Sequence, residues 1–259
     1  MKIRLTHIGM ATVLLELGAL RILTDPALDP PGRTYRFGFG TSSIKNRAPT
    51  LPPEGLGRID AVLLSHDHHA DNLDDAGRAM LPSVGRIITT ASGAQRLAAL
   101  ANVQGLAPWQ SAELENGGVR VKITATPARH GPPLSGPIVG DVIGFMLESD
   151  AFSQGPLYIS GDTVWFAGIA ELAKRFQVGT ALLHLGGVSF PISGPLRYTF
   201  SGVEAVRAAE ALGAKTVIPI HYDGWTHFRE QRATSEHTLS KLGARVRWLK
   251  QGEPTELEA

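Results

Sequence analysis

The chain has 259 residues, contains no cysteine, and carries a formal net charge of only +1, with 25 Lys and Arg against 24 Asp and Glu. The lack of cysteine excludes disulfides, thiolate zinc sites, iron–sulfur clusters and cysteine nucleophiles. The balanced charge and the 43 % of hydrophobic residues argue against a disordered chain. The basic residues form no stripe, so we expect no nucleic-acid partner.

The N-terminus does not resemble a targeting segment. The apolar run at residues 11–17 is interrupted by Glu16 and is too short for the hydrophobic region of a signal peptide. No stretch approaches the ~20 apolar residues of a membrane span. We therefore expect a cytoplasmic protein that acts on a small molecule and makes no membrane contact.

The first third of the sequence alternates short β-type segments with Gly and Pro. It predicts strands at residues 2–8, 12–17 and 21–24, arranged as a meander with turns at Gly9 and Gly18. Residues 29–53 are rich in Gly, Pro, Arg and aromatics, and predict a long surface loop with little regular structure. A loop of that length is often a lid or a binding loop.

From residue 57 onward the pattern becomes mixed and then alternates strand with helix. Strands are predicted at 59–64, 86–90, 119–126, 142–148, 157–160, 179–185, 216–220 and 246–249, and helices at 92–100, 165–176, 201–212 and 235–242. Ser92 and Ser201 are predicted N-caps, and Gly213 is predicted to end the third helix. No linker or repeat divides the chain, so we expect a single domain over residues 1–259. Two β halves with helices outside them would form a four-layer αββα sandwich of the α/β class.

A cluster of candidate metal ligands lies at residues 65–72, which read SHDHHADN and follow an apolar strand. Imidazole nitrogens and carboxylate oxygens are the ligands that Zn²⁺, Mn²⁺ and Fe²⁺ use. His66 and His68 could reach one metal from an extended chain end. His69 and Asp71 could do the same in the shifted register.

Three further ligand-type residues follow other predicted strands: His130, Asp162 and His221. Each alone has an ordinary explanation as a core or turn residue. Together they indicate a metal site, because one edge of a sheet system would gather residues from successive strand ends. The motifs of serine hydrolases, zincins and P-loop proteins do not occur in the sequence.

These features resemble the metallo-β-lactamase superfamily over nearly the whole chain. The resemblance is strongest to small bacterial metal-dependent hydrolases that include the L-ascorbate-6-phosphate lactonase-like proteins, in TDP at 24–26, RHGP around His130, GDT at 161–163 and HYDGW from His221. It implies an αββα sandwich with a metal centre at one edge of the two sheets. It also implies that His130 completes a first metal site, that Asp162 bridges two metals, and that His221 belongs to a second site.

The sequence departs from the superfamily motif H-x-H-x-D-H. A one-residue insertion would reconcile the two, giving His66, His69 and Asp71 as ligands with Asn72 in place of the last His. His68 is the rival second ligand. The resulting second site would be rich in oxygen ligands, so we expect two metal sites of unequal affinity.

The resemblance implies a metal-dependent hydrolase in which metal-bound hydroxide attacks an ester, lactone or phosphodiester. Asp71 and Asp162 are the predicted catalytic carboxylates. We expect one or two divalent ions, with zinc favoured and manganese or iron as alternatives. An iron-dependent redox protein on the same fold and a degenerate, non-catalytic metal-binding protein are the competing interpretations.

A further set of residues is predicted to contact substrate. His184, Tyr222 and Trp225 are the first candidates, with His227 beside them. Arg33, Tyr35, Arg36 and Phe37 are predicted to form a lid over an anionic or ring-shaped substrate.

Overall fold

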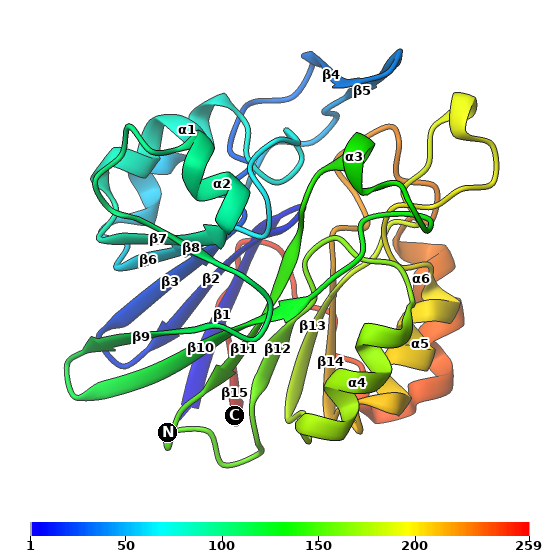
Figure 1. The fold of residues 1–259 in the computed structure, drawn as a ribbon. Helices are drawn as coiled ribbons and strands as arrows, with labels where there is room; N and C mark the ends of the chain where they lie inside the picture. The colour runs from blue at the N-terminus through cyan, green and yellow to red at the C-terminus, as the bar shows by residue number, and fades with distance from the viewer. Residues whose placement is uncertain (1, 259) are drawn as a thin grey trace.

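The computed structural model describes residues 2–258, in which the strands form two large sheets and a separate hairpin (Figure 1). The strands are β1 Lys2–Gly9, β2 Thr12–Leu17, β3 Leu20–Thr24, β4 Thr34–Gly38, β5 Thr41–Ile44, β6 Ala61–Leu63, β7 Arg86–Thr90, β8 Val103–Leu106, β9 Ser111–Asn116, β10 Val119–Pro127, β11 Ile143–Glu148, β12 Leu157–Ile159, β13 Thr180–His184, β14 Thr216–Ile220 and β15 Thr255–Glu258. The first sheet has the order β15-β1-β2-β3-β6-β7-β8, and the second has the order β14-β13-β12-β11-β10-β9. The hairpin consists of β4 and β5.

Helices cover the outer faces of both sheets. The α-helices are α1 Asp75–Met80, α2 Ala91–Arg96, α3 Gly136–Val139, α4 Ala167–Arg175, α5 Gly202–Ala211 and α6 Arg232–Leu239, and the 3-10 helices are η1 Pro53–Leu56, η2 Leu81–Ser83, η3 Pro191–Ser193 and η4 Ser240–Arg245. Among the described residues, none of these helices combines the length and apolar character needed to cross a bilayer.

The main core lies between the two sheets. It joins side chains of the first sheet, such as Leu15 and Ile22, to side chains of the second, such as Phe145 and Ile159. A second apolar cluster seals α4, α5 and α6 onto the outer face of the second sheet, and a third lies under the segments that cover the first sheet. The predicted four-layer αββα sandwich is therefore confirmed.

The strands that precede the candidate ligands run in one direction within each sheet. Strand β10, which precedes His130, is antiparallel to β11, and β11 is antiparallel to β12, so β10 and β12 point the same way. In the second sheet β12, β13 and β14 are parallel, and in the first sheet β3, β6 and β7 are parallel. Carboxyl ends of parallel strands meet at one edge of a sheet, and there the chain leaves for its loops. Figure 1 shows the β4–β5 hairpin, α3 and the yellow loop that carries η3 at the same end of the sandwich.

Helix starts follow local capping chemistry. The predicted cap of α5 is confirmed: Ser201 Oγ accepts from the Glu204 N–H, and Glu204 accepts from the Ser201 N–H at 3.0 Å, which forms a capping box. Helix α2 begins earlier than predicted, because Thr90 at the end of β7 accepts the Gly93 N–H at 2.9 Å and takes the cap in place of Ser92.

Two predicted segments differ in type from the structure, and the last helix begins at Arg232 and not at Ser235. Residues 29–53 were expected to lack regular structure, but they contain the hairpin of β4 and β5. Residues 246–249 were expected to form the last strand, yet Val246 makes only an isolated bridge to Val217. Pro219 of β14 has no N–H to continue such a ladder. The last strand is β15, which pairs antiparallel with β1.

A buried ion pair ties the base of the hairpin to α1. Lys45 follows β5, and its Nζ lies 2.8 Å from Asp74 Oδ2 and 3.0 Å from the Ala27 carbonyl oxygen. Both charged side chains are fully buried. Asp74 also caps α1 by accepting the Gly77 N–H at 3.0 Å. The hairpin and the helix are thereby held in one fixed relation.

Replacing Lys45 by Met should lower the free energy of unfolding by ~3–5 kcal/mol, because Asp74 is then left as a buried charge with no partner. Adding Asp74→Asn to Lys45→Met should recover most of that loss, since the amide removes the charge and still caps α1. Urea titration measures each variant.

Arg33→Met is the matched control, because Arg33 pairs with Asp75 at the exposed surface. It should change stability by no more than about 1 kcal/mol. Equal losses of unfolding free energy in Lys45→Met and Arg33→Met would show that burial does not make the Lys45–Asp74 pair more important for stability than an exposed pair.

Candidate metal centre

Two of the predicted imidazole ligands are oriented by hydrogen bonds on the nitrogen that faces away from the centre. Ser65 Oγ lies 2.9 Å from His66 Nδ1, and His130 Nδ1 lies 2.7 Å from the Tyr198 carbonyl oxygen, to which it donates. The Ser65 N–H in turn donates to Asp25 at 2.7 Å. With Nδ1 engaged, each ring presents Nε2 to the centre, as is usual for metal-ligating histidines.

Three imidazole nitrogens converge on one point. His69 Nδ1 lies 3.1 Å from His66 Nε2 and 2.9 Å from His130 Nε2. Burial lowers the pKa of His130 to about 4, and burial with the neighbouring imidazoles holds the pKa of His66 and of His69 well below the usual value. All three rings are therefore neutral at pH 7, which is the form that binds a metal.

Asp162 and His221 approach the same centre from the second sheet. Gly161, which precedes Asp162, has a φ of 58°, and a Cβ there would lie 2.6 Å from the Ile143 carbonyl oxygen. This turn needs glycine, and it carries Asp162 from the end of β12 into the centre. His221 follows β14 with a φ of 58°, which is uncommon for a residue other than glycine.

Asp162 is shared by two potential ligand groups. One group joins His66, His130 and Asp162, and the other joins Asp71, Asp162 and His221, with the ligand atoms of each group within 4.8 Å of one another. A carboxylate has two oxygens, so this placement suits an ion on each side of Asp162. The structure thus brings together His66, His69, Asp71, His130, Asp162 and His221.

The electrostatics of the second group are those of a buried charge pair. Burial raises the pKa of Asp162 to about 6. Burial alone would lower the pKa of His221, but Asp162 and Asp71 outweigh it and raise that pKa to about 9. Burial would likewise raise the pKa of Asp71, but the imidazoles of His221 and His227, whose Nε2 atoms lie 3.5 and 3.0 Å from its Oδ2, hold it well below the usual range.

The other residues of the His/Asp cluster point elsewhere. His68 Nε2 contacts the Val139 carbonyl oxygen, although His68 lies near enough to His66 and His69 to form a group with them. Asp67 is held by Arg96 through two nitrogens, at 2.6 and 2.9 Å. Asn72 is buried and its amide nitrogen lies 3.4 Å from Ser65 Oγ. The side chain in the position of the missing motif histidine therefore contacts a residue that orients His66.

The predicted substrate residues His184, Tyr222 and Trp225 are buried and do not line the pocket above the centre. His184 Nε2 lies 3.3 Å from Asp25 Oδ2, behind the ligand loop. Tyr222 packs against Trp248, and Trp225 packs against Tyr35 and Phe37. None of the three has surface in the pocket, although Trp225 packs against the wall residue Phe37.

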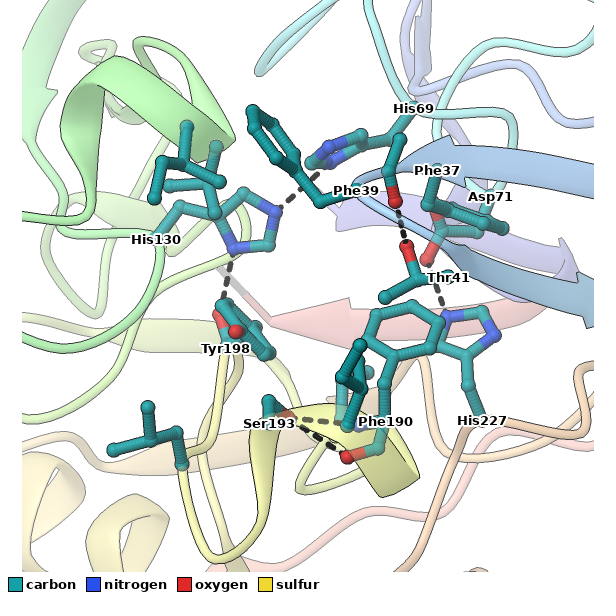
Figure 2. A pocket seen from close by; sticks show the side chains of 16 residues that line it. Phe37, Phe39, Thr41, His69, Asp71, His130, Phe190, Ser193, Tyr198 and His227 are labelled. Atoms are coloured by element: carbon teal, nitrogen blue, oxygen red, sulfur yellow. Dashed lines mark hydrogen bonds and ion pairs between the residues drawn. The ribbon is translucent and has the colours of Figure 1, made fainter.

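His227, which the sequence indicates only as a possible substrate contact beside Trp225, lies at the centre in the structure. Its Nε2 lies 3.0 Å from Asp71 Oδ2 (Figure 2). Its Nδ1 contacts Ser43 Oγ of β5. Its ring stacks on Phe190, with centroids 5.2 Å apart and planes 9° apart. The sequence signal was weak, because His227 follows no strand directly.

A pocket of about 290 Å³ opens over these residues. Four polar residues of the centre line it, namely His69, Asp71, His130 and His227, and much of the remaining wall is aromatic or aliphatic (Figure 2). Of the predicted lid residues only Phe37 lines the pocket. Arg33 pairs with Asp75, and Tyr35 donates a hydrogen bond to Asp29. The pocket and the centre share one opening.

The family is established by comparison with known proteins. The model described as the beta-lactamase superfamily domain matches residues 20–222, which is most of the chain. This chain therefore belongs to the metallo-β-lactamase superfamily, as its fold and its His/Asp centre indicate.

Individual proteins give the next level of detail. A UPF0173 metal-dependent hydrolase from Pelotomaculum thermopropionicum is 31 % identical over 271 residues, which cover 98 % of this chain and 100 % of that protein. Isothiocyanate hydrolase from Delia radicum gut bacteria has a similar structure, with a TM-score of 0.82, 24 % identity and 99 % of each chain covered. Igni18, a metallo hydrolase from Ignicoccus hospitalis, matches with a TM-score of 0.74, 22 % identity and 100 % of each chain covered.

These relatives support the predicted class: the chain is a metal-dependent hydrolase of this superfamily. They do not single out the L-ascorbate-6-phosphate lactonase-like branch, which stays a prediction.

His227→Ala should lower turnover and the retention of metal by ~10–100-fold, the range typical of residues that orient a metal ligand. The reason is that Asp71 loses the neighbour that holds one of its oxygens. His227→Gln should recover part of the loss, because a Gln amide can donate to the same oxygen. Metal content after dialysis and kcat are the two readouts.

His237→Ala is the control, since this histidine lies at the exposed surface of α6. It should leave both readouts unchanged. Unchanged metal retention in His227→Ala would contradict a positioning role for His227.

Proposed function

We propose that the chain hydrolyses an ester, lactone or phosphodiester bond at a centre of two unequal metal ions. The observation that carries the proposal is a set of buried polar atoms at the centre that lack a hydrogen-bond partner. Asp71 Oδ1, Asp162 Oδ1 and His221 Nε2 are buried and have no hydrogen-bond partner among the described residues. Buried polar atoms are rarely left unpaired, and divalent cations would satisfy these. The donor set therefore fits the metal that the superfamily implies.

The two ligand groups differ in chemistry. His66, His69 and His130 with Asp162 form a nitrogen-rich group that suits Zn²⁺. Asp71, Asp162 and His221 form a group richer in oxygen that also suits harder ions such as Mn²⁺. A bound divalent cation would lower the pKa of water toward ~7 and polarise the bond to be cleaved. The complete set of ligands supports a hydrolase over the non-catalytic interpretation.

The protein groups orient the reactants and move the proton. Asp71, held by His227, lies on the pocket side of the centre and can take a proton from the attacking water. For an ester, the oxygen of water bonds to the acyl carbon, the acyl–oxygen bond breaks, and the proton passes to the departing alcohol. His69 and His130 face the same pocket, which places the reacting atoms between the ligands and the apolar walls.

Asp162→Ala should remove metal and hydrolysis together, because both ligand groups use this carboxylate. We expect kcat to fall by more than about 100-fold, beyond the range of a residue that only orients a ligand. The measurement is elemental analysis, followed by ester, lactone and phosphodiester panels with protein reconstituted with Zn²⁺, Mn²⁺ or Fe²⁺. Asp60→Asn is the control, because Asp60 lies at the opposite end of β6 and accepts the Arg21 N–H at 2.9 Å. Full metal content and turnover in Asp162→Ala would refute the assignment.

The register of the histidine cluster predicts a contrast between two adjacent variants. Zn²⁺ titration of apo-protein should show a tight and a weak phase. His69→Ala should abolish the tight phase, because its Nδ1 faces His66 and His130, whereas His68→Ala should keep it. The reverse pattern would assign the ligand role to His68.

A further inference from the structure

The pocket walls beyond the His/Asp centre are largely apolar. Phe37, Phe39, Val139, Val188 and Phe190 all line the cavity. Among the described residues that line it there is no Lys, Arg or Glu, and Asp71 is the one carboxylate. The ionisable groups of the centre thus lie at the reacting end, and beyond them the polar lining residues are the neutral Thr41, Ser193 and Tyr198, which offer no cation to an anionic substrate.

The apolar surface continues outward to the mouth. Phe39, Ile138, Ile192 and Leu196 line the pocket and yet are 70 %, 56 %, 73 % and 44 % exposed. They come from three segments that meet there, namely the β4–β5 hairpin, α3 and the loop that carries η3. Large exposed apolar side chains gathered around one opening mark a binding surface.

The basic residues of the segments that form the mouth lie outside the cavity lining. Arg33 pairs with Asp75 and Arg197 with Glu204, and Arg36, which precedes Phe37 on β4, is exposed. None of them lines the pocket. A phosphate or carboxylate held among the apolar walls, away from the metal centre, would therefore lose its hydration without gaining a charged partner.

We infer that the part of the substrate beyond the bond that is cleaved is uncharged, and that its apolar acyl or aryl group occupies this cavity and extends over its rim. The inference rests on the proposed function, and it excludes sugar phosphates and other substrates that carry an anion away from the reacting group. Water adds at the polar end, as described above, and the apolar group remains between Phe37 and Phe190. The preference among substrates then depends on how much apolar area each substrate buries in the cavity.

The test compares p-nitrophenyl esters with the metal-loaded enzyme. From acetate to butyrate to hexanoate, kcat/KM should rise roughly fourfold for each added methylene, because burying one methylene contributes ~0.8 kcal/mol. The anionic hemisuccinate should react about 100-fold or more slowly than pentanoate, a neutral ester of matched length, because its carboxylate would be buried unpaired.

Ile138→Lys tests the wall directly. A cation at the exposed mouth should lower kcat/KM for the hexanoate and raise it for the hemisuccinate, so that their ratio falls at least tenfold. A fold defect would lower both rates together and leave the ratio unchanged. Val203→Lys, at another exposed apolar residue outside the pocket, is the matched control and should leave the ratio unaltered.

A binding measurement separates this inference from the proposed function. The neutral fluorophore N-phenyl-1-naphthylamine should bind metal-free protein saturably, and Ile138→Lys should weaken that binding several-fold while Val203→Lys does not. If the fluorophore binds in this way but no ester is cleaved, the apolar pocket stands and the proposed hydrolysis fails.

Two other results would overturn the inference itself. Ester cleavage with no preference for neutral substrates would leave hydrolysis established and the apolar substrate class refuted. A change of sedimentation behaviour in Ile138→Lys, with unchanged ester selectivity, would show that the rim covers a second copy of the chain.

Discussion

Desolvation of the ligand cluster is the constraint on which the rest of the site depends. Imidazoles and carboxylates are removed from water where the two sheets meet, and burial alone would neutralise each of them. The carboxylates of Asp71 and Asp162 oppose this at His221, whereas His66, His69 and His130 have no such neighbour at hydrogen-bond distance and become neutral. The protein therefore divides one buried cluster into a neutral, nitrogen-rich half and a charged, oxygen-rich half.

The residues around the ligands hold the ligand side chains in the orientations that this division needs. Backbone and hydroxyl groups fix His66 and His130 through the nitrogen that faces away from the centre. Asp25, behind the loop, accepts the Ser65 N–H, and burial raises its pKa to about 7. These contacts fix the orientations of imidazole rings that come from different strands and loops, so that the rings face the same centre. The altered motif is consistent with this arrangement, because Asn72 contacts Ser65 and lies behind His66.

The fold and most of the ligand candidates could be predicted from the sequence, and the reason is physical. Strand–ligand order is local information, and the parallel arrangement of β12, β13 and β14 turns that order into proximity. The role of His227 depended on a long-range contact with Asp71 that no local pattern reports. The β4–β5 hairpin was missed because its strands are short and the segment around them, residues 29–53, is rich in Gly and Pro. His184 was taken for a pocket residue because the end of a buried strand does not reveal which way its last side chain turns.

The Lys45–Asp74 pair has a consequence for how molecules enter the pocket. Lys45 also exchanges backbone hydrogen bonds with the start of the hairpin, through Gly32 N–H to its carbonyl oxygen at 2.8 Å and its own N–H to Arg33 at 3.2 Å. The base of the hairpin is thus fastened on both strands and to the helix that follows the ligand loop. Motion is left to the tip, where Phe39 has a positive φ and little cover. A molecule that enters the pocket therefore meets a hairpin whose base is fixed, and adjustment of this wall is confined to the tip around Phe39.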